Sequence, residues 1–189
     1  MIKELVLKNR SYRSFSPARE ITSEEVTDMI KCARITPSAM NLQPLRYRIC
    51  VTKEDREALF PLTAWAGKLK DIKLPPKGHE PRAYIVMCTD NTIVDSPKAA
   101  WRDVGICAQT ILLRAAEMGL GGCMLGAFSA EKVSKALSID EKYSPALIIA
   151  LGEPDEEIIL EDANGDVSYY RDESGVHRVP KRKLEDVII

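Results

Sequence analysis

Two arginines lie three residues apart near the start of the chain, within the segment Asn9–Phe15. A guanidinium group is planar and permanently charged, and its N–H groups match the oxygens of a phosphate two at a time. One helical turn or a tight bend would direct both Arg10 and Arg13 at one anion, and Ser11 would add a hydroxyl. Taken alone, the segment is better explained as a solvated helix end that carries arginines. Two other segments favour a phosphate site.

The first of them is a loop in which two prolines bracket small residues and two carboxamides. Pro37 and Pro44 restrict the backbone and disfavour a helix, so the segment is predicted to be a loop of limited freedom. Asn41 and Gln43 each carry donors and an acceptor, which suits recognition of the edge of a heteroaromatic ring. A turn in which these carboxamides bond to their own backbone is the alternative, and the loop alone does not decide between the two.

The second is a basic cluster, Lys181–Lys183, far from Arg10 in the sequence. In addition, Gly126 ends an apolar strand, where a planar ligand could approach the backbone without meeting a side chain. Combined with the arginines and the carboxamides, these features favour a ligand that joins a phosphate to a flat, hydrogen-bonding ring. Neither GxGxxG nor GxxxxGKS/T is present, which disfavours the Rossmann and P-loop modes of nucleotide binding.

Composition and charge restrict the function classes. Hydrophobic residues make up 45% and charged residues 29% of the 189 residues, as in a globular protein with a real core. The formal charge of -1 disfavours an overall attraction to nucleic acid or membranes, although residues 1–50 hold nine basic against five acidic residues. No apolar run reaches the ~20 residues of a membrane-spanning helix. With no signal peptide pattern, we expect a cytoplasmic protein.

The cysteines do not form a recognisable metal or disulfide pattern. There are five, each in an apolar setting and without a CxxC pair: Cys32, Cys50, Cys88, Cys107 and Cys123. This pattern predicts reduced, buried thiols. The chain has only two histidines, neither near a cysteine in the sequence, so no metal site is expected.

The hydrophobic pattern predicts one α+β domain over residues 1–189. Helical spacing and capping signals predict helices over 2–9, 22–34, 52–60, 97–118 and 129–137. Alternation of polar and apolar residues predicts a strand over 46–51 with one exposed face, and apolar runs predict strands over 83–88, 123–126 and 145–151. Residues 61–81 are predicted to be a long irregular connection, residues 155–180 to form two polar hairpin arms, and residues 181–189 to be an extension that docks on another sheet.

Five short motifs occur along the chain: Arg-Ser-x-Arg-x-Phe at 10–15, Pro-Ser-Ala-x-Asn-x-Gln-Pro at 37–44, the Asp-x-Gly…Ala-Gln helix at 103–109, Gly-Leu-Gly at 119–121 and Lys-Arg-Lys-Leu-Glu at 181–185. Together they resemble the nitroreductase family of FMN-dependent oxidoreductases. The resemblance runs in family order from Lys8 to the C-terminus, and each motif is weak alone while the set is specific.

The resemblance implies a homodimeric nitroreductase-like fold with two FMN sites at the subunit interface. The fold would have a central mixed or antiparallel sheet flanked by helices, a long helix at the dimer interface and a C-terminal arm added to the partner. By position, the residues that would bind the phosphate and ribityl chain are Arg10, Ser11, Arg13, Lys181 and Arg182. The partner would contribute Pro37, Ser38, Ala39 and Asn41, with Gln43 as support for that loop. Leu125 and Gly126 would lie near flavin N5.

The implied reaction is hydride transfer from NAD(P)H to flavin N5 and on to a nitroaromatic, quinone or similar small acceptor, in a ping-pong sequence. The cofactor supplies the chemistry, so no side chain is assigned as catalytic. Ser11, Ser38 and the cysteines lack a histidine partner, and His177 is predicted to lie on the surface of the second hairpin arm. The alternatives are a specialised flavoenzyme of dehydrogenase or dehalogenase type on the same scaffold and a non-catalytic flavin- or nucleotide-binding module.

Overall fold

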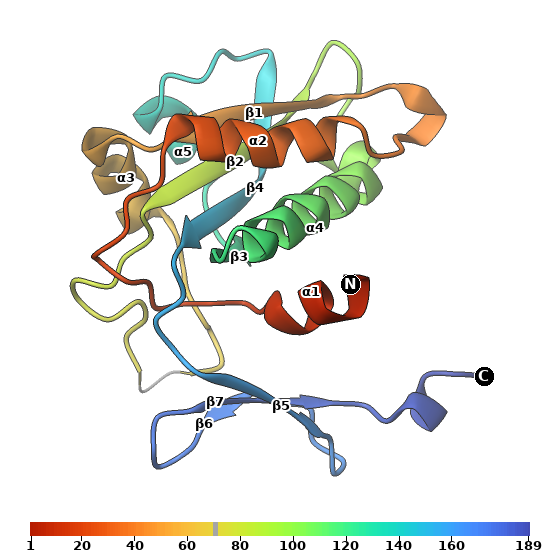
Figure 1. Ribbon diagram of the computed structural model, residues 1–189. Coiled ribbons are helices and arrows are strands. Elements are labelled where there is room, and N and C mark those ends of the chain that lie inside the picture. The colour runs from red at the N-terminus through yellow and green to blue at the C-terminus, as the bar shows by residue number, and fades with distance from the viewer. Residues whose placement is uncertain (70–71) are drawn as a thin grey trace.

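The sheet at the centre of the molecule has four antiparallel strands in the order β1-β2-β4-β3, as Figure 1 shows for the computed structural model. The structure describes residues 1–69 and 72–189. The strands are β1 (Leu45–Cys50), β2 (Ala83–Asp90), β3 (Gly121–Leu125) and β4 (Tyr143–Gly152). The predicted α+β class, with an antiparallel sheet flanked by helices, is confirmed.

Helices cover both faces of this sheet (Figure 1). One face carries α2 (Ser23–Arg34) and α4 (Trp101–Glu117), the other carries α3 (Lys53–Leu59) and α5 (Ala130–Ala136), and α1 (Ile2–Lys8) packs beside α4. A 3-10 turn over Pro97–Ala100 precedes α4, so the long helix predicted over 97–118 begins in tighter geometry. None of the described helices is long and apolar enough to cross a membrane.

Strand β2 explains why both faces need cover, because every one of its residues is buried. Side chains alternate between the faces of a strand. Ile85 and Met87 therefore pack with α2 and α4, while Tyr84 and Val86 pack with α3 and α5. The prediction that the apolar run 83–88 forms a strand buried on both faces is confirmed.

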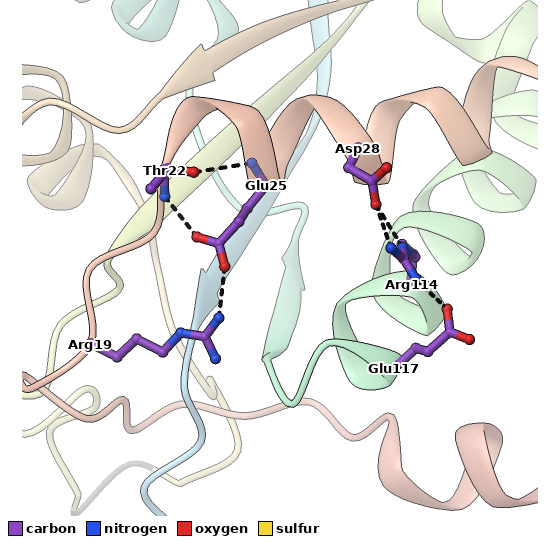
Figure 2. A network of polar contacts seen from close by, with 6 residues as sticks. All are labelled: Arg19, Thr22, Glu25, Asp28, Arg114 and Glu117. Carbon is purple, nitrogen blue, oxygen red and sulfur yellow. Dashed lines mark hydrogen bonds and ion pairs between the residues drawn. The ribbon is translucent and has the colours of Figure 1, made fainter.

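Polar contacts fix α2 at its start and against α4 (Figure 2). Thr22 and Glu25 form a capping box, with N–H to oxygen distances of 3.2 and 2.9 Å, and Arg19 binds the same Glu25 carboxylate. Nearer the other end of the helix, Asp28 accepts from Nε of Arg114 on α4 at 2.7 Å. The capping box predicted from the sequence is confirmed, and it sets where the helix begins.

The arm region 155–180 differs from the two predicted hairpins. It forms a three-stranded sheet with β7 (His177–Lys181) between β5 (Ile158–Asp162) and β6 (Tyr170–Arg171). Only β6 and β7 make a hairpin, closed by Asp172, which accepts from the N–H groups of Ser174 and Val176. Strand β7 lies parallel to β5 and takes the place expected for residues 167–170. Turn residues in the sequence indicate hairpins between neighbouring segments, whereas the β5–β7 pairing joins segments that are distant in the sequence.

Strand β3 begins two residues earlier than predicted, at the two glycines that follow α4. Both glycines are places of close backbone approach: a Cβ on Gly121 would meet the Tyr12 ring, and one on Gly122 would meet the carbonyl oxygen of Ala150. The strand thus packs tightly between β4 and the Ser11–Tyr12 segment. The connection predicted over 61–81 is irregular where it is described, apart from the turn Phe60–Leu62, and residues 70 and 71 lie outside the described residues.

Candidate functional site

A cavity of about 400 Å³ lies beside the segment that follows α1. It brings together four of the predicted phosphate and ribityl residues, Arg10, Ser11, Arg13 and Lys181. The wall is completed by residues of α4, β3 and the three-stranded sheet, by Asn9 after α1 and by Tyr169 before β6; the element residues are Gln109, Leu112, Met124, Ile158, His177 and Val179. The two ends of the chain, far apart in the sequence, therefore meet at one site.

The Ser11–Phe15 segment is held by the sheet edge on one side. Ser11 pairs with Gly122 as an isolated parallel bridge, and the Tyr12 N–H donates to the Gly122 carbonyl at 3.0 Å. Phe15 is fully buried, and its ring fills the space above Gly152, where a Cβ would overlap it. These contacts fix the backbone from which Arg10 and Arg13 extend.

Arg13 has a defined side-chain position. Its Nη1 donates to the Ser11 carbonyl at 3.1 Å and lies 3.3 Å from Nε2 of His177, and its guanidinium lies 5.2 Å from the centre of the Tyr169 ring. Within the described residues no protein atom accepts from its Nε or Nη2. Arg10 donates from Nη2 to the Val6 carbonyl, while its buried Nε has no partner among the described residues. Both arginines thus retain unused donors.

His177 is 2% exposed, so the prediction that it lies on the surface is wrong. It is covered by residues distant in sequence, because Arg13 and Tyr169 pack over it, the latter ring edge-on at 5.3 Å. Burial, with the charges of Arg13 and Arg171, lowers the pKa of His177 to about 4. The imidazole is therefore neutral at pH 7 and accepts from Arg13 through Nε2.

A pH dependence of stability follows from this pKa. In the unfolded chain His177 takes up a proton as the pH falls below 6.5, whereas in the folded chain its pKa is about 4. Protonation therefore favours the unfolded state, and the free energy of unfolding decreases between these two pH values. Between pH 7 and 5 we expect this group alone to cost about 2 kcal/mol of unfolding free energy. Urea unfolding of the wild type and of His177→Leu at both pH values isolates the contribution. Equal losses in the two proteins would contradict it.

The carboxamide loop lies elsewhere, at a second cavity of about 170 Å³ that includes Pro37, Ser38 and Gln43. The loop is held by Asp103, a buried residue of α4, which accepts from the Ser38 hydroxyl and from the Ala39 N–H at 3.2 Å. Ser38 Oγ in turn accepts from the Gln43 N–H at 2.9 Å. Asp103 thus interrupts the apolar stripe of α4 as a buried contact of this loop.

This anchoring holds a strained backbone. Met40, Asn41 and Gln43 have φ values of 50°, 55° and 50°, in the left-handed region that non-glycine residues rarely adopt. The Gln43 amide donates to Asn41 Oδ1 at 3.1 Å, so the two carboxamides also bond to each other. The loop is a preformed element whose shape depends on Asp103.

Removing that anchor should be costly. Asp103→Ala leaves the Ser38 hydroxyl and the Ala39 N–H without a partner beside a strained backbone, so we expect a loss of about 2 kcal/mol in unfolding free energy. Urea unfolding measures it, and limited proteolysis reports whether cleavage moves to residues 37–44. Glu117→Ala, at an exposed ion pair of the same helix, is the matched control and should cost under about 1 kcal/mol. Equal losses would refute the anchoring role.

The remaining predicted residues border neither cavity. These are Ala39, Asn41, Leu125, Gly126 and Arg182. Leu125 is buried, whereas its neighbour Met124 reaches the 400 Å³ cavity. Gly126 is exposed, with open space where a side chain would stand. Met124, Tyr169 and His177 were not predicted from the sequence, and Gln109 was named only as part of a motif without a role at the site. The alternation along β3 could have indicated Met124, but nothing local marks Tyr169 or His177.

The cysteines do not supply a nucleophile at the site. Cys123 is buried next to Met124, and burial raises the pKa of its thiol. Burial likewise raises the pKa values of Cys50 and Cys88 to about 12. All three are protonated at neutral pH and act as small apolar side chains.

Comparisons with known proteins point to one family. The model of the nitroreductase family matches residues 6–153. A provisionally named NADH dehydrogenase/NAD(P)H nitroreductase of Archaeoglobus fulgidus is 30% identical in an alignment of length 159 that covers 82% of this chain and 86% of that protein. The provisionally named NAD(P)H nitroreductase YodC of Bacillus subtilis is 25% identical in an alignment of length 177 that covers 78% of this chain and 87% of that protein.

A similar fold is found among solved structures. A provisionally named nitroreductase of Exiguobacterium sibiricum, solved in complex with FMN, superposes with a TM-score of 0.70 at 18% identity, covering 100% of this chain and 96% of that chain. The likeness at this identity concerns the fold, including the sheet and the helices that flank it.

Proposed function

The chain belongs to the nitroreductase family, and we propose that it binds FMN in the 400 Å³ cavity and uses NADH or NADPH to reduce a small oxidised acceptor such as a nitroaromatic or a quinone. The observation that carries the proposal is a cavity lined by Arg10, Arg13 and Lys181, in which Nε and Nη2 of Arg13 have no acceptor among the described residues. The NAD(P)H nitroreductase names of the relatives and the FMN of the solved neighbour agree with it.

The cavity fits an anionic cofactor. Three of its lining residues are cationic, and no acidic side chain is among the described residues that line it. The buried Nε of Arg10 is a donor without a partner, and such a group is costly to bury unless a ligand oxygen satisfies it. The apolar side chains of Leu112, Met124 and Val179 supply surface for a flat ring beside the charged end.

Each group of residues then has a role. Arg10, Ser11, Arg13 and Lys181, which line the cavity, would bind the phosphate and ribityl chain. The family resemblance adds Arg182 to this group and places Leu125–Gly126 beside the ring, although none of the three lines the cavity. When bound, FMN supplies hydride chemistry that no side chain of this chain can perform. The chain itself would bind and orient the cofactor. We assign no side chain as acid, base or nucleophile.

The proposal includes a homodimer in which the partner's carboxamide loop completes the site. Within one chain the loop borders its own cavity and not the one with the arginines, so a second copy is needed to bring Pro37, Ser38, Ala39 and Asn41 to the cofactor, with Gln43 as support. Exposed apolar side chains on the neighbouring helices α1 and α4, Leu7 and Trp101 among them, support an interface there. The exposed Val187–Ile189 tail fits docking on the partner.

The first experiment is a visible absorption spectrum of the purified protein, repeated after anaerobic addition of NADH or NADPH. We expect a yellow protein that releases FMN on denaturation and is bleached by one nucleotide. A protein that binds FMN but is not bleached would be a binding module, and one that neither contains nor takes up FMN would refute the proposal. Light scattering tests the dimer, and an FMN-bound monomer would contradict the shared site.

A further inference from the structure

The guanidinium of Arg13 has its donors divided into two sets. Both hydrogens of Nη1 are used inside the protein, one by the Ser11 carbonyl at 3.1 Å and the other by Nε2 of His177 at 3.3 Å. The Tyr169 ring covers one face of the group at 5.2 Å. The edge formed by Nε and Nη2, the side-on fork that binds phosphate oxygens in pairs, has no acceptor among the described residues. The protein thus selects which edge of Arg13 a ligand meets.

His177 can perform this selection because its own position is fixed. Its backbone N–H donates to the Glu157 carbonyl at 2.9 Å, and β7 lies between β5 and β6, so the backbone is held in the middle of this sheet. The ring packs against Arg13 and Tyr169. Accepting at Nε2 places the imidazole proton on Nδ1, which is buried and has no partner among the described residues, and the ring presents a lone pair to Arg13.

The charge of the side chain that accepts from Arg13 also matters. Aspartate or glutamate at this place would orient Arg13 and also cancel the charge offered to a phosphate. The nearby acid, Glu156, is engaged elsewhere: it binds the Arg171 guanidinium and the backbone N–H of Arg13. The side chain of Arg13 therefore gains an orienting acceptor that is neutral, and its positive charge remains available.

We propose that His177 is a positioning residue for phosphate recognition, which holds the Nε–Nη2 edge of Arg13 towards the cavity without neutralising its charge. The inference rests on the proposed FMN site and assigns to this buried histidine a role in selecting ligands that carry a phosphate. Replacing His177 should therefore lower the affinity for FMN and leave unchanged the affinity for riboflavin, which has the same ring and ribityl chain without the phosphate.

The test compares three substitutions by titration of apo-protein with FMN and with riboflavin, followed by flavin fluorescence. His177→Leu removes the acceptor and keeps the bulk. His177→Gln places an amide oxygen near the former Nε2, whereas His177→Asn places its amide near the former Nδ1. We expect Leu and Asn to weaken FMN binding about tenfold and Gln to stay within about threefold of the wild type, with riboflavin unchanged throughout. Thermal unfolding checks that each variant is folded.

The outcomes separate this inference from the proposed function. If the wild type binds FMN but His177→Leu leaves FMN affinity unchanged, or lowers FMN and riboflavin affinity equally, the positioning role is refuted and the cofactor site stands. If the Leu variant does not fold, the Gln and Asn pair decides, and equal affinities in the two refute the role. Adding His177→Leu to Arg13→Ala should cause no further loss of FMN affinity, and an additive loss would show that His177 does not act through Arg13.

Discussion

Arg13→Ala is expected to weaken FMN binding by about a hundredfold while the protein stays folded. The free edge of Arg13 can donate two charge-assisted hydrogen bonds to one phosphate, and each such bond contributes about 1.5 kcal/mol or more. Losing both costs about 3 kcal/mol, and each 1.4 kcal/mol is a factor of ten in affinity. Fluorescence titration of apo-protein with FMN gives the dissociation constants.

Two controls define what this result means. Riboflavin affinity should be nearly unchanged, because the loss concerns the phosphate. Arg19→Ala removes an arginine outside the cavity, one that pairs with Glu25 at the start of α2, and should bind FMN like the wild type (Figure 2). Retention of wild-type FMN affinity by Arg13→Ala would mean that the phosphate lies elsewhere.

The largest effect on stability is expected from Gly122→Ala. A Cβ at this position would overlap the carbonyl oxygen of Ala150 on the neighbouring strand and approach Leu112 Cδ2 to 2.8 Å. Because the obstacle is backbone within a sheet, it cannot rotate away, and β3 must separate from β4. We expect a loss of about 3 kcal/mol in unfolding free energy, measured by urea unfolding.

The same substitution should also affect the site, because the Gly122 carbonyl accepts from the Tyr12 N–H and so fixes the segment that carries Arg13. Gly126→Ala is the matched control: it lies just beyond the same strand, its φ is not positive, and nothing stands within 4 Å of the new methyl group. It should change stability by under about 0.5 kcal/mol. Equal losses in the two variants would refute the argument from close packing.

Most of the central fold could be predicted from the sequence, because its signals are local. The capping box at Thr22 and Glu25 marks the start of α2, and the apolar run at 83–88 marks a strand covered on both faces. The arginine pair is also a local pattern, since its guanidinium groups lie three residues apart, but the segment alone favours a solvated helix end. The family resemblance linked Arg10 and Arg13 to Lys181 across the chain.

The remainder could not be predicted because it depends on pairing between distant segments. His177 is a polar residue in a polar stretch, and its burial results from Arg13 and Tyr169. The parallel pairing of β7 with β5 follows from no turn signal, whereas the β6–β7 hairpin does. Asp103 is a polar residue in the apolar stripe of α4, but no local signal identifies its partner Ser38, which lies 65 residues away.

The three-stranded sheet β5–β7–β6 has a consequence for how the ligand leaves. It supplies Arg13 with His177, a partner 164 positions later in the chain, and Glu156, which binds the Arg13 N–H, lies just before β5. His177 is the only fully buried residue of the described strands of this sheet. Elements with so little buried surface open locally while the rest of a protein stays folded. Amide hydrogens of this sheet should exchange with solvent faster than those of β2 and β4, and bound FMN should slow them. The residence time of the cofactor would then be governed by a local opening of the arm and not by global unfolding.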